Sequence, residues 1–416
     1  SDWNIDTGDV ADREAAQQVT VYTAPVEASI DVIQIVPDEY EEEGFTYYDE
    51  DVQDRLAYTL LDLTRKESYT LESPLAVLNP FGTGSNGLYL YFRTDAPTRV
   101  TYTVHVEDES IPDYTATVNN QGADADGYSR LQEFLLIGLV PGMENTVTLS
   151  AETRQQGTAY TFTIDMPESA SGYASQLEVE DGGADAGQLS DGLFYAMGFG
   201  DYYGYTFFFD NEGVLRYEMV LEGYHSDRFL WDDDGSLITC VGSRKVARIN
   251  RFGQVAQVYG LGQYELHHDI NWGPEGTILA LATDTEGETV EDQVLKIDLT
   301  TGEVSHVVDF TQVLQSYFEE TRPVQATDPF GLWSEGEWDW LHLNSLQYVE
   351  EDNAIIVSSR ETSTIIKATL EEEPRIQWMA GNPDFWEGTD FASYSLEAEG
   401  DFLFQYGQHD VEQMDA

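Results

Sequence analysis

Four histidines stand at the start of similar segments in the second half of the chain: His225, His268, His342 and His409. After each of the first three come a short strand-forming stretch, a turn with Gly or Asn, and a strongly apolar stretch, which together predict a β-hairpin. In a β-propeller the first strand of each blade lines the central channel, so equivalent positions in successive blades face one axis. We therefore expect these imidazoles to meet in space.

The alternative for any one of them is a hydrogen-bonded core residue, because a buried histidine is usually structural. The set is harder to explain in this way, since four of the seven histidines share one repeat position. His105 and His306 carry no other motif.

Two further side chains extend the predicted cluster. Asn344 follows His342 at the spacing that places two side chains on one face of a strand. Arg360 ends the apolar stretch AIIVSSR, where the alternative is a surface charge at a strand end. A planar guanidinium and several imidazoles can bind the oxygens of a small tetrahedral anion, while one neutral imidazole attacks it as a nucleophile. The pattern thus favours covalent group transfer through histidine.

The charge balance excludes several classes of partner. The chain has 78 acidic and 19 basic residues, for a formal net charge of −59. Such a field repels nucleic acid and anionic membrane surfaces, and the plain explanation of the acidity is solubility, as in a salty or extracellular setting. Cys240 is the one cysteine, so no intrachain disulfide can form. No apolar run approaches the roughly 20 residues that a membrane span needs.

We expect four regions along the chain. Residues 1–70 are an N-terminal extension with a strand pair and one amphipathic helix over 52–66, whose leucines 56, 60, 61 and 63 lie at helical spacing. Residues 71–168 alternate strands in the manner of a small fibronectin-like β-sandwich, with a turn at Pro141 and Gly142. Residues 169–192 read as a linker or loop, and 193–416 as a propeller with four repeat units and the start of a fifth at His409. The predicted fold class is all-β.

No cofactor or metal is predicted. The segments DADG (124–127) and DDDG (232–235) resemble pieces of a calcium loop, but neither continues to the acidic twelfth position, and Asp-Gly is ordinary turn chemistry. The chain has no Gly-rich phosphate loop, nucleophile elbow or HExxH zinc motif.

Five strings in this order resemble the bacterial aryl-sulfate sulfotransferases, the kind that uses no nucleotide sulfate donor. They are HHD (267–269), DWLHLNSLQY (339–348), AIIVSSR (354–360), IQWMAGNP (376–383) and GQHDV (407–411). The resemblance runs from about residue 70 onward and implies a β-sandwich followed by a six-bladed propeller. It also implies that His409 is transiently sulfated, that Arg360, His342 and Asn344 hold the sulfuryl oxygens, and that His268 is an additional donor or acid–base residue.

Two neighbours of these positions are assigned to substrate binding less directly. His267 either contributes to the site or only packs, because the HHD motif does not separate the two histidines. Many relatives have His after the arginine of SSR, whereas this chain has Glu361. If that position contacts substrate, the added carboxylate alters acceptor choice or weakens anion binding.

The expected function is sulfuryl transfer from an aryl sulfate to a phenol in two steps through His409, with these small molecules as partners. Aromatic residues near the repeats are candidates for the phenol pocket, with core packing as the alternative: Tyr202, Tyr203, Trp333 and Trp338. One alternative function is a non-catalytic propeller that binds a glycan or a protein. Another is a hydrolase that uses paired carboxylates.

The two ends of the sequence suggest two more expectations. The chain starts at Ser1, as an exported protein does once its leader is removed, so a periplasmic, cell-surface or secreted location is expected. Relatives continue beyond the GQH motif, so we expect a C-terminal part that is missing here. A homo-oligomer or a separate C-terminal fragment would then complete the propeller.

Overall fold

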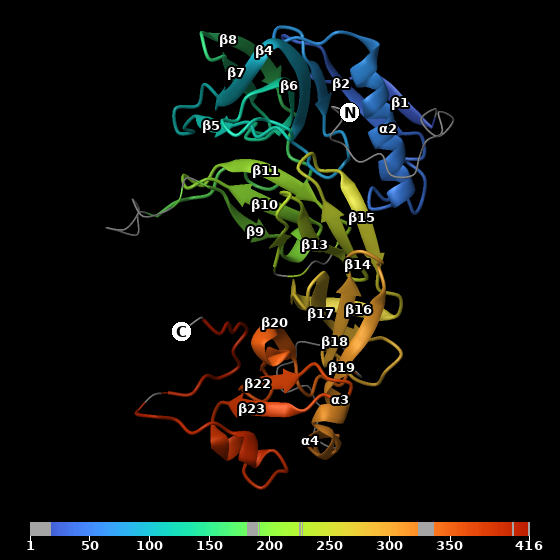
Figure 1. Cartoon of the computed structure of the whole chain (residues 1–416), viewed down its shortest axis with the longest axis vertical. Helices are drawn as coiled ribbons and strands as arrows, with labels where there is room; N and C mark the ends of the chain where they lie inside the picture. Colours follow the sequence, from blue (N-terminus) through green and yellow to red (C-terminus); the bar gives the residue numbers. More distant parts are fainter. Residues whose placement is uncertain are drawn as a thin grey trace. The chain divides into compact units, whose positions relative to one another are not determined.

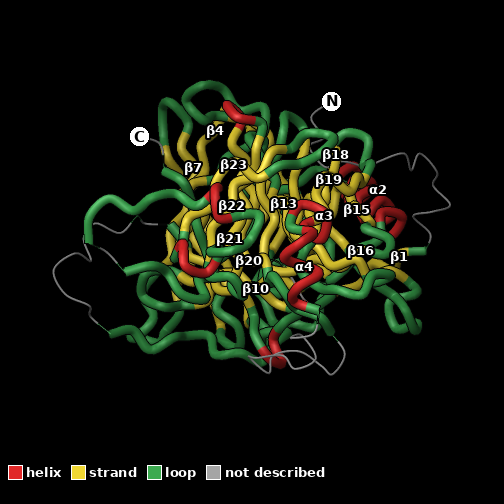
Figure 2. Tube along the Cα trace, turned by 90° about the horizontal axis from the view of Figure 1, so that it is seen from below, coloured by secondary structure: helices red, strands yellow, loops and turns green. Residues whose placement is uncertain are grey.

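The computed structural model describes residues 18–180, 190, 192–223, 226, 228–322, 337–401 and 403–414 (Figure 1). Predictions for His225 and Trp333 lie outside these residues. The chain divides into two compact units: the first holds the described residues up to 223 together with 233–236 and 248–258, and the second holds the remainder. Strands dominate both, with few helices among the described residues (Figure 2). The predicted all-β class is confirmed.

An eight-stranded sheet in the first unit contains all the strands predicted before residue 168. Its main order is β1-β2-β3-β4-β7-β8, with β5 and β6 also paired to β4. The strands are β1 (Val19–Thr23), β2 (Val32–Pro37), β3 (Leu75–Leu78), β4 (Leu88–His105), β5 (Tyr114–Thr117), β6 (Ser129–Leu136), β7 (Glu144–Glu152) and β8 (Gly157–Asp165). Because β2 pairs with β3, the N-terminal strand pair continues the same sheet across residue 70. The predicted region boundaries themselves stay predictions.

Strand β4 is one continuous strand of 18 residues. Its register shifts between Arg93 and Thr98, so its first half pairs with β3 and β6 and its second half with β5 and β7. A strand that changes sheets in this way forms a corner of a sandwich. Gly142, in the predicted turn between β6 and β7, has a φ of 70°, which glycine adopts at little cost.

The predicted amphipathic helix is α2 (Glu50–Lys66), capped by the Asp49 side chain, which accepts a hydrogen bond from the Val52 amide. Leu56, Leu60 and Leu63 join an apolar cluster with β3 and β4 residues, which confirms packing as the role of this helix face. Leu61 lies outside that cluster. Among the described residues, no helix is long and apolar enough to cross a membrane.

Four consecutive sheets follow, each with its strands ordered along the chain as in a propeller blade. The first is three-stranded: β9 (Phe194–Met197), β10 (Tyr205–Phe209) and β11 (Leu215–Val220). The other three have four strands each: β12 (Leu230–Trp231), β13 (Leu237–Gly242), β14 (Lys245–Ile249) and β15 (Val255–Gly260); β16 (Tyr264–Trp272), β17 (Thr277–Asp284), β18 (Gln293–Asp298) and β19 (Val304–Asp309); β20 (Leu343–Val349), β21 (Ala354–Ser359), β22 (Thr364–Thr369) and β23 (Ile376–Ala380). Helices α3 (Phe310–Val313) and α4 (Gln315–Thr321) follow β19.

The sheets β16–β19 and β20–β23 share one apolar core, which holds in place the strands that carry the predicted site residues. Leu279 and Leu281 of β17 pack in one cluster with Leu343 and Leu346 of β20. The amide of Asn271 in β16 also donates a 2.7 Å hydrogen bond to the Leu346 carbonyl. The inner strands of the two sheets are therefore locked side by side.

The prediction that a new strand starts at His409 is wrong for the described residues, because 403–414 contain no strand. Side chains of β20 hold this segment instead of a backbone ladder. The Gln413 amide donates to Gln347 Oε1 at 2.7 Å and the Val411 amide to Ser345 Oγ at 3.2 Å. The segment that carries His409 thus lies along β20 without pairing to it.

Candidate functional site

Two of the repeat histidines sit at irregular positions of the inner strands. His268 has a φ of 51° and lies within a register shift of β16 between Leu266 and Ile270. His342 has a φ of 53° and directly precedes β20, whose register shifts between Leu343 and Ser345. Left-handed backbone costs a non-glycine residue of order 1 kcal/mol, and such irregularities redirect side chains. The two positions therefore share their local geometry as well as their place in the repeat.

Three of the four predicted histidines meet in space. The ring centroids of His268 and His342 are 4.9 Å apart, those of His342 and His409 5.5 Å, and those of His268 and His409 5.9 Å. His267 adds a fourth ring, with its Nδ1 3.0 Å from Nδ1 of His268. The cluster joins β16, the start of β20 and the C-terminal segment, so three of the predicted imidazoles meet although His409 lies on no strand.

Burial keeps two of these imidazoles neutral. It lowers the pKa of His267 well below its usual value, with further lowering by His268 and His342. Burial also lowers the pKa of His268 to about 3, aided by the nearby positive charges of His342 and His409 when protonated and of Arg360. At neutral pH His268 is thus a hydrogen-bonding group and a poor proton donor for acid catalysis.

His409 differs from the others because it is exposed. Its Nδ1 lies 3.0 Å from the Gly407 carbonyl oxygen, which can only accept a hydrogen bond. Nδ1 therefore carries the proton, and in the neutral ring the lone pair is on Nε2. This tautomer is the one that a nucleophilic Nε2 requires.

His342 rests on two buried carboxylates that the sequence interpretation did not identify. Its Nδ1 is 2.7 Å from Asp339 Oδ2 and 2.7 Å from Glu291 Oε2, and all three side chains are 2% exposed. Burial alone would lower the pKa of His342, but the hydrogen bonds to Asp339 and Glu291 raise it to about 9. Burial raises the pKa of Glu291 to about 7, against the opposite effect of His342. Asp339 was visible within DWLHLNSLQY, whereas no motif marks Glu291.

Arg360 is buried, so the alternative of a surface charge at a strand end is wrong. Its side chain is 4% exposed, and its Nη2 donates to Asp339 Oδ2 at 3.2 Å. Both Nε and Nη2 donate to Glu361 Oε1, at 2.8 and 2.5 Å. The predicted anion-binding fork is therefore engaged by carboxylates of the protein itself. Burial raises the pKa of Glu361, which Arg360 partly offsets.

Asn344 connects β20 to the segment that carries His409. Its amide donates a 2.7 Å hydrogen bond to the carbonyl of Gln408, the residue before His409. The Asn344 Oδ1 atom is buried and has no hydrogen-bond partner among the described residues. The predicted roles of Asn344 and the other site residues in substrate binding stay predictions.

Two of the aromatic candidates pack against other aromatic rings. Trp338 is 8% exposed and stacks on Phe318 with ring centroids 4.6 Å apart, which favours packing. Tyr202 packs against Tyr173 and Phe207 in the first unit, and Tyr203 is in that unit as well. Trp333 lies outside the described residues.

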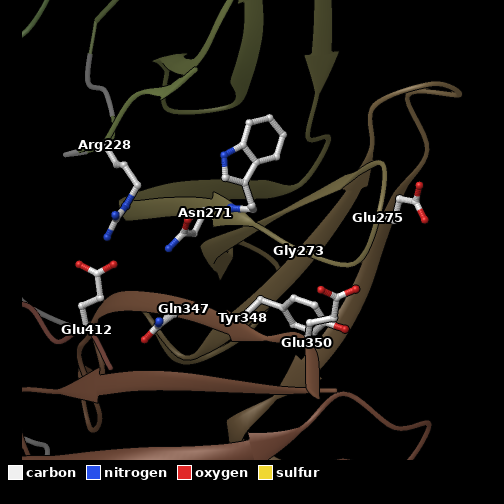
Figure 3. Close-up of a pocket in the computed structure, with 9 residues that line it drawn as sticks. Arg228, Asn271, Gly273, Glu275, Gln347, Tyr348, Glu350 and Glu412 are labelled. Carbon is white, nitrogen blue, oxygen red and sulfur yellow. Dashed lines mark hydrogen bonds between the residues drawn. The ribbon is translucent and has the colours of Figure 1, made fainter. Parts of the chain in front are cut away.

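A polar pocket of about 520 Å³ opens between the ends of β16 and β20 (Figure 3). It is lined by Arg228, Asn271, Trp272, Gly273, Glu275, Gln347, Tyr348, Glu350 and Glu412, and by none of the clustered imidazoles. Arg228 and Glu412 point toward one another in Figure 3, while Arg228 donates to Asp269, the neighbour of His268. The pocket thus borders the site without containing its chemistry.

The imidazole cluster also has the spacing of metal ligands. One ligand atom from each of His268, His342 and His409 lies within 4.8 Å of the others. Two further sets meet the same limit: the first is His267, His268 and Glu291, and the second is Glu291, Asp339 and His342. Two positively charged side chains disfavour a metal ion here: Arg360, and His342, whose pKa is raised to about 9. The cationic pair suits an anion better than a metal ion.

Two family models and one curated relative all indicate the same protein family. The sequence model of the arylsulfotransferase (ASST) family matches residues 178–416, and the model of the arylsulfotransferase Ig-like domain matches residues 75–167. A curated relative, arylsulfate sulfotransferase AssT of Escherichia coli O6:H1 (strain CFT073), is 22% identical over 326 residues, which cover 68% of this chain and 51% of AssT. The chain thus spans about half the length of that relative.

Among solved structures, hydrazine synthase of Kuenenia stuttgartiensis matches 74% of this chain and 79% of its own, with 11% identity and a TM-score of 0.31. The WD40 β-propeller domain of Doa1 matches 71% of this chain and 86% of its own, with 11% identity and a TM-score of 0.29. The family match needs no support from these distant likenesses, because it covers more than half of the chain. The protein belongs to the arylsulfotransferase (ASST) family.

Proposed function

We propose that this protein transfers a sulfuryl group from an aryl sulfate to a phenol, with His409 as the group that carries it between the two. The observation that carries this proposal is the place of His409: an exposed imidazole whose Nδ1–H is bound by the Gly407 carbonyl and whose ring adjoins His268 and His342. A nucleophile needs both an accessible lone pair and neighbours that stabilise the transferred group.

In the first step, Nε2 of His409 attacks sulfur and forms an N–S bond, while the bond between sulfur and the aryl oxygen breaks. The electron pair leaves with the aryloxide, and a singly charged sulfuryl group remains on His409. In the second step the oxygen of an acceptor phenol attacks the same sulfur, its proton passes through solvent to the released aryloxide, and the N–S bond breaks with its electron pair returning to Nε2. The histidine is restored, and no oxidant or cofactor is consumed.

The charges around His409 support this chemistry. His342 and Arg360 are the cationic groups beside the imidazole cluster, and each is held by buried carboxylates. They provide local positive charge for the sulfuryl oxygens in a chain whose formal charge is −59. The low pKa of His268 assigns it a neutral hydrogen-bonding role toward those oxygens.

A non-catalytic binding module is the second candidate, and one observation favours it. Glu361 already occupies two donors of Arg360, which reduces the capacity of this guanidinium for an external anion. The two candidates differ in a simple measurement, because a binding module has no turnover.

The test is release of 4-nitrophenol from 4-nitrophenyl sulfate by the full chain, with and without a phenol acceptor. The His409→Ala variant should lose several orders of magnitude in turnover, since it lacks the nucleophile. His306→Ala is the matched control, because His306 is an exposed histidine of β19 outside the cluster. Circular dichroism verifies that both variants fold.

Absence of turnover in the wild-type chain would favour the binding module. Turnover that survives in His409→Ala would exclude the histidine mechanism and favour a hydrolase based on carboxylates. Acid-labile [³⁵S]sulfuryl label, retained by the wild-type protein and absent from His409→Ala, would establish the covalent step.

A further inference from the structure

Glu291 reaches the site from the neighbouring sheet. It lies between β17 and β18 with a left-handed φ of 58°. Its amide donates to Thr283 Oγ1 at 2.9 Å, and its carbonyl accepts from the Leu343 amide at 3.1 Å. The loop of one sheet is thereby tied to the first residue of β20. The backbone of Glu291 is held on both sides, so its side chain has a defined direction.

The carboxylate of Glu291 converges with that of Asp339 on one ring nitrogen. Both oxygens lie 2.7 Å from His342 Nδ1, and the three side chains are almost fully buried. The 2.7 Å hydrogen bond with Asp339 Oδ2 places a proton on His342 Nδ1, because an ionised carboxylate only accepts hydrogen bonds. The second negative charge also stabilises a positive charge on the ring, since burial makes an unpaired carboxylate costly.

Asp339 alone is not equivalent to the pair. Its Oδ2 also accepts a hydrogen bond from Arg360 Nη2, so its charge is divided between two cationic side chains. Among the described ion pairs, Glu291 Oε2 contacts only His342. Glu291 Oε1 makes one longer contact, of 3.9 Å, with His268. Glu291 is therefore the carboxylate whose charge is directed mainly at His342.

We propose that Glu291 is a positioning residue that holds His342 as an imidazolium: Nδ1–H donates to Asp339, Glu291 Oε2 lies beside the same nitrogen as a second counter-charge, and the ring adjoins His268 and His409. The proposal rests on the proposed function and adds to it the group that keeps His342 charged. His342 enters the reaction as a charged donor to the sulfuryl group. This role does not follow from the family match.

The other titratable groups around His342 agree with this division of charge. His267 and His268 of β16 face it as neutral rings, and His409 faces it from the C-terminal segment. Asp339 precedes β20, and Arg360 and Glu361 follow β21. Tyr317 of α4 adjoins Glu361, where burial raises its pKa to about 12 and keeps it neutral. His342 and Arg360 are the two cationic side chains in contact with these carboxylates.

The first test observes His342 directly in the full chain labelled with [¹⁵N]histidine. The ring signals of His342, assigned by their loss in His342→Asn, should remain those of an imidazolium up to about pH 8. In Glu291→Gln, which keeps the shape and removes the charge, the titration midpoint should fall by at least one pH unit. Glu303→Gln removes an exposed charge in the same sheet and should leave the midpoint unchanged.

The second test uses kinetics to separate positioning from simple structural support. Glu291→Gln should move the alkaline limb of kcat/KM for 4-nitrophenyl sulfate to lower pH, and Glu291→Asp should restore part of the wild-type profile because it restores the charge. Glu303→Gln should keep the wild-type profile. A merely structural role would lower activity at every pH by the same factor.

The proposal is overturned if His342 titrates near pH 6.5 in the wild-type chain, or if Glu291→Gln changes neither the midpoint nor the alkaline limb. If Glu291→Gln does not fold, the wild-type titration and the Asp339→Asn variant decide the matter. The NMR titration requires no turnover, so it distinguishes a failure of this proposal from a failure of the proposed function.

Discussion

Arg360 donates hydrogen bonds from both Nε and Nη2 to Oε1 of Glu361, the residue that follows it, at 2.8 and 2.5 Å. The Arg360 side chain is 4% exposed and that of Glu361 7%, so solvent screens this pair little. A guanidinium whose donors are engaged by a buried carboxylate binds an external anion only if that carboxylate is displaced or protonated. Glu361 is thus an intramolecular competitor for the group that is proposed to hold the sulfuryl oxygens.

We expect Glu361→Gln to tighten anion binding, because it removes the competing charge and keeps the side-chain shape. The KM for an aryl sulfate should fall roughly five- to tenfold, which corresponds to a charge-assisted hydrogen bond of about 1–1.5 kcal/mol. Steady-state kinetics at pH 7 measure this change, with the exposed Glu371→Gln as control. An unchanged or higher KM would show that Glu361 does not compete with the substrate.

Arg360→Lys should impair transfer strongly although the charge is kept. A single ammonium cannot reproduce the planar donors that contact Asp339 and Glu361, and loss of one oriented donor at a reacting oxyanion costs about 10²-fold in kcat. Turnover of 4-nitrophenyl sulfate measures the loss, and Arg375→Lys on the surface is the control. Wild-type turnover in Arg360→Lys would remove Arg360 from the sulfuryl site.

Acid should destabilise the fold through the two neutral histidines. The pKa of His268 falls from 6.5 to about 3 on folding, and that of His267 also falls. Below about pH 6.5 the unfolded chain binds protons that the folded chain excludes, so stability is complete above this pH and decreases as the pH falls toward 3. For His268 the loss between pH 8 and pH 5 is about 2 kcal/mol.

Urea unfolding at pH 8 and pH 5 measures this effect in wild type and in His268→Gln. The variant should lose less stability on acidification than the wild type, whereas His306→Gln should behave like the wild type because His306 is exposed. Equal acid sensitivity of His268→Gln and wild type would show that His268 is not the group that resists protonation.

Trp340→Phe should lower the stability of the apolar core that the sheets β16–β19 and β20–β23 share. The Trp340 side chain is fully buried, and its Nε1 donates to Asp292 Oδ2 at 2.8 Å. The variant leaves a cavity and removes a donor from a buried carboxylate, at a cost of about 3 kcal/mol. Urea unfolding measures the difference, and Trp231→Phe, at a tryptophan that is 56% exposed, should cost under about 0.5 kcal/mol. Equal costs would contradict the buried role of Trp340.

The hairpins of the repeats were predictable because their signals are local. An apolar stretch bounded by Gly or Asn turns specifies a strand pair over about 15 residues, and β16–β19 and β20–β23 follow that pattern. The repeat position of His268 and His342 then predicted their meeting, since successive sheets bring equivalent positions together, whereas His409 joins them from a segment without a strand. Asn344 was predicted from its spacing to His342, and Arg360 from its place at the end of the next apolar stretch.

The strand expected at His409 shows where local reasoning failed. The residues after His409 resemble the start of another repeat, but a strand needs a backbone partner as well as a suitable sequence. Side chains of Ser345 and Gln347 bind this backbone instead. Local pattern specifies a strand only where the tertiary structure supplies a neighbour for its amides and carbonyls.

Glu291 was beyond the reach of sequence reasoning altogether. It is one of 78 acidic residues, in a loop (TEGETVEDQ) whose composition is typical of solvent-exposed turns. Only the tertiary structure buries it, because the Leu343 amide binds its carbonyl and brings its carboxylate to His342. Sequence alone determined the hairpins and the order of the histidine motifs, since both depend on short-range patterns. The convergence of Glu291, Asp339 and Arg360 on the site was decided by packing between sheets, which no pattern within one segment encodes.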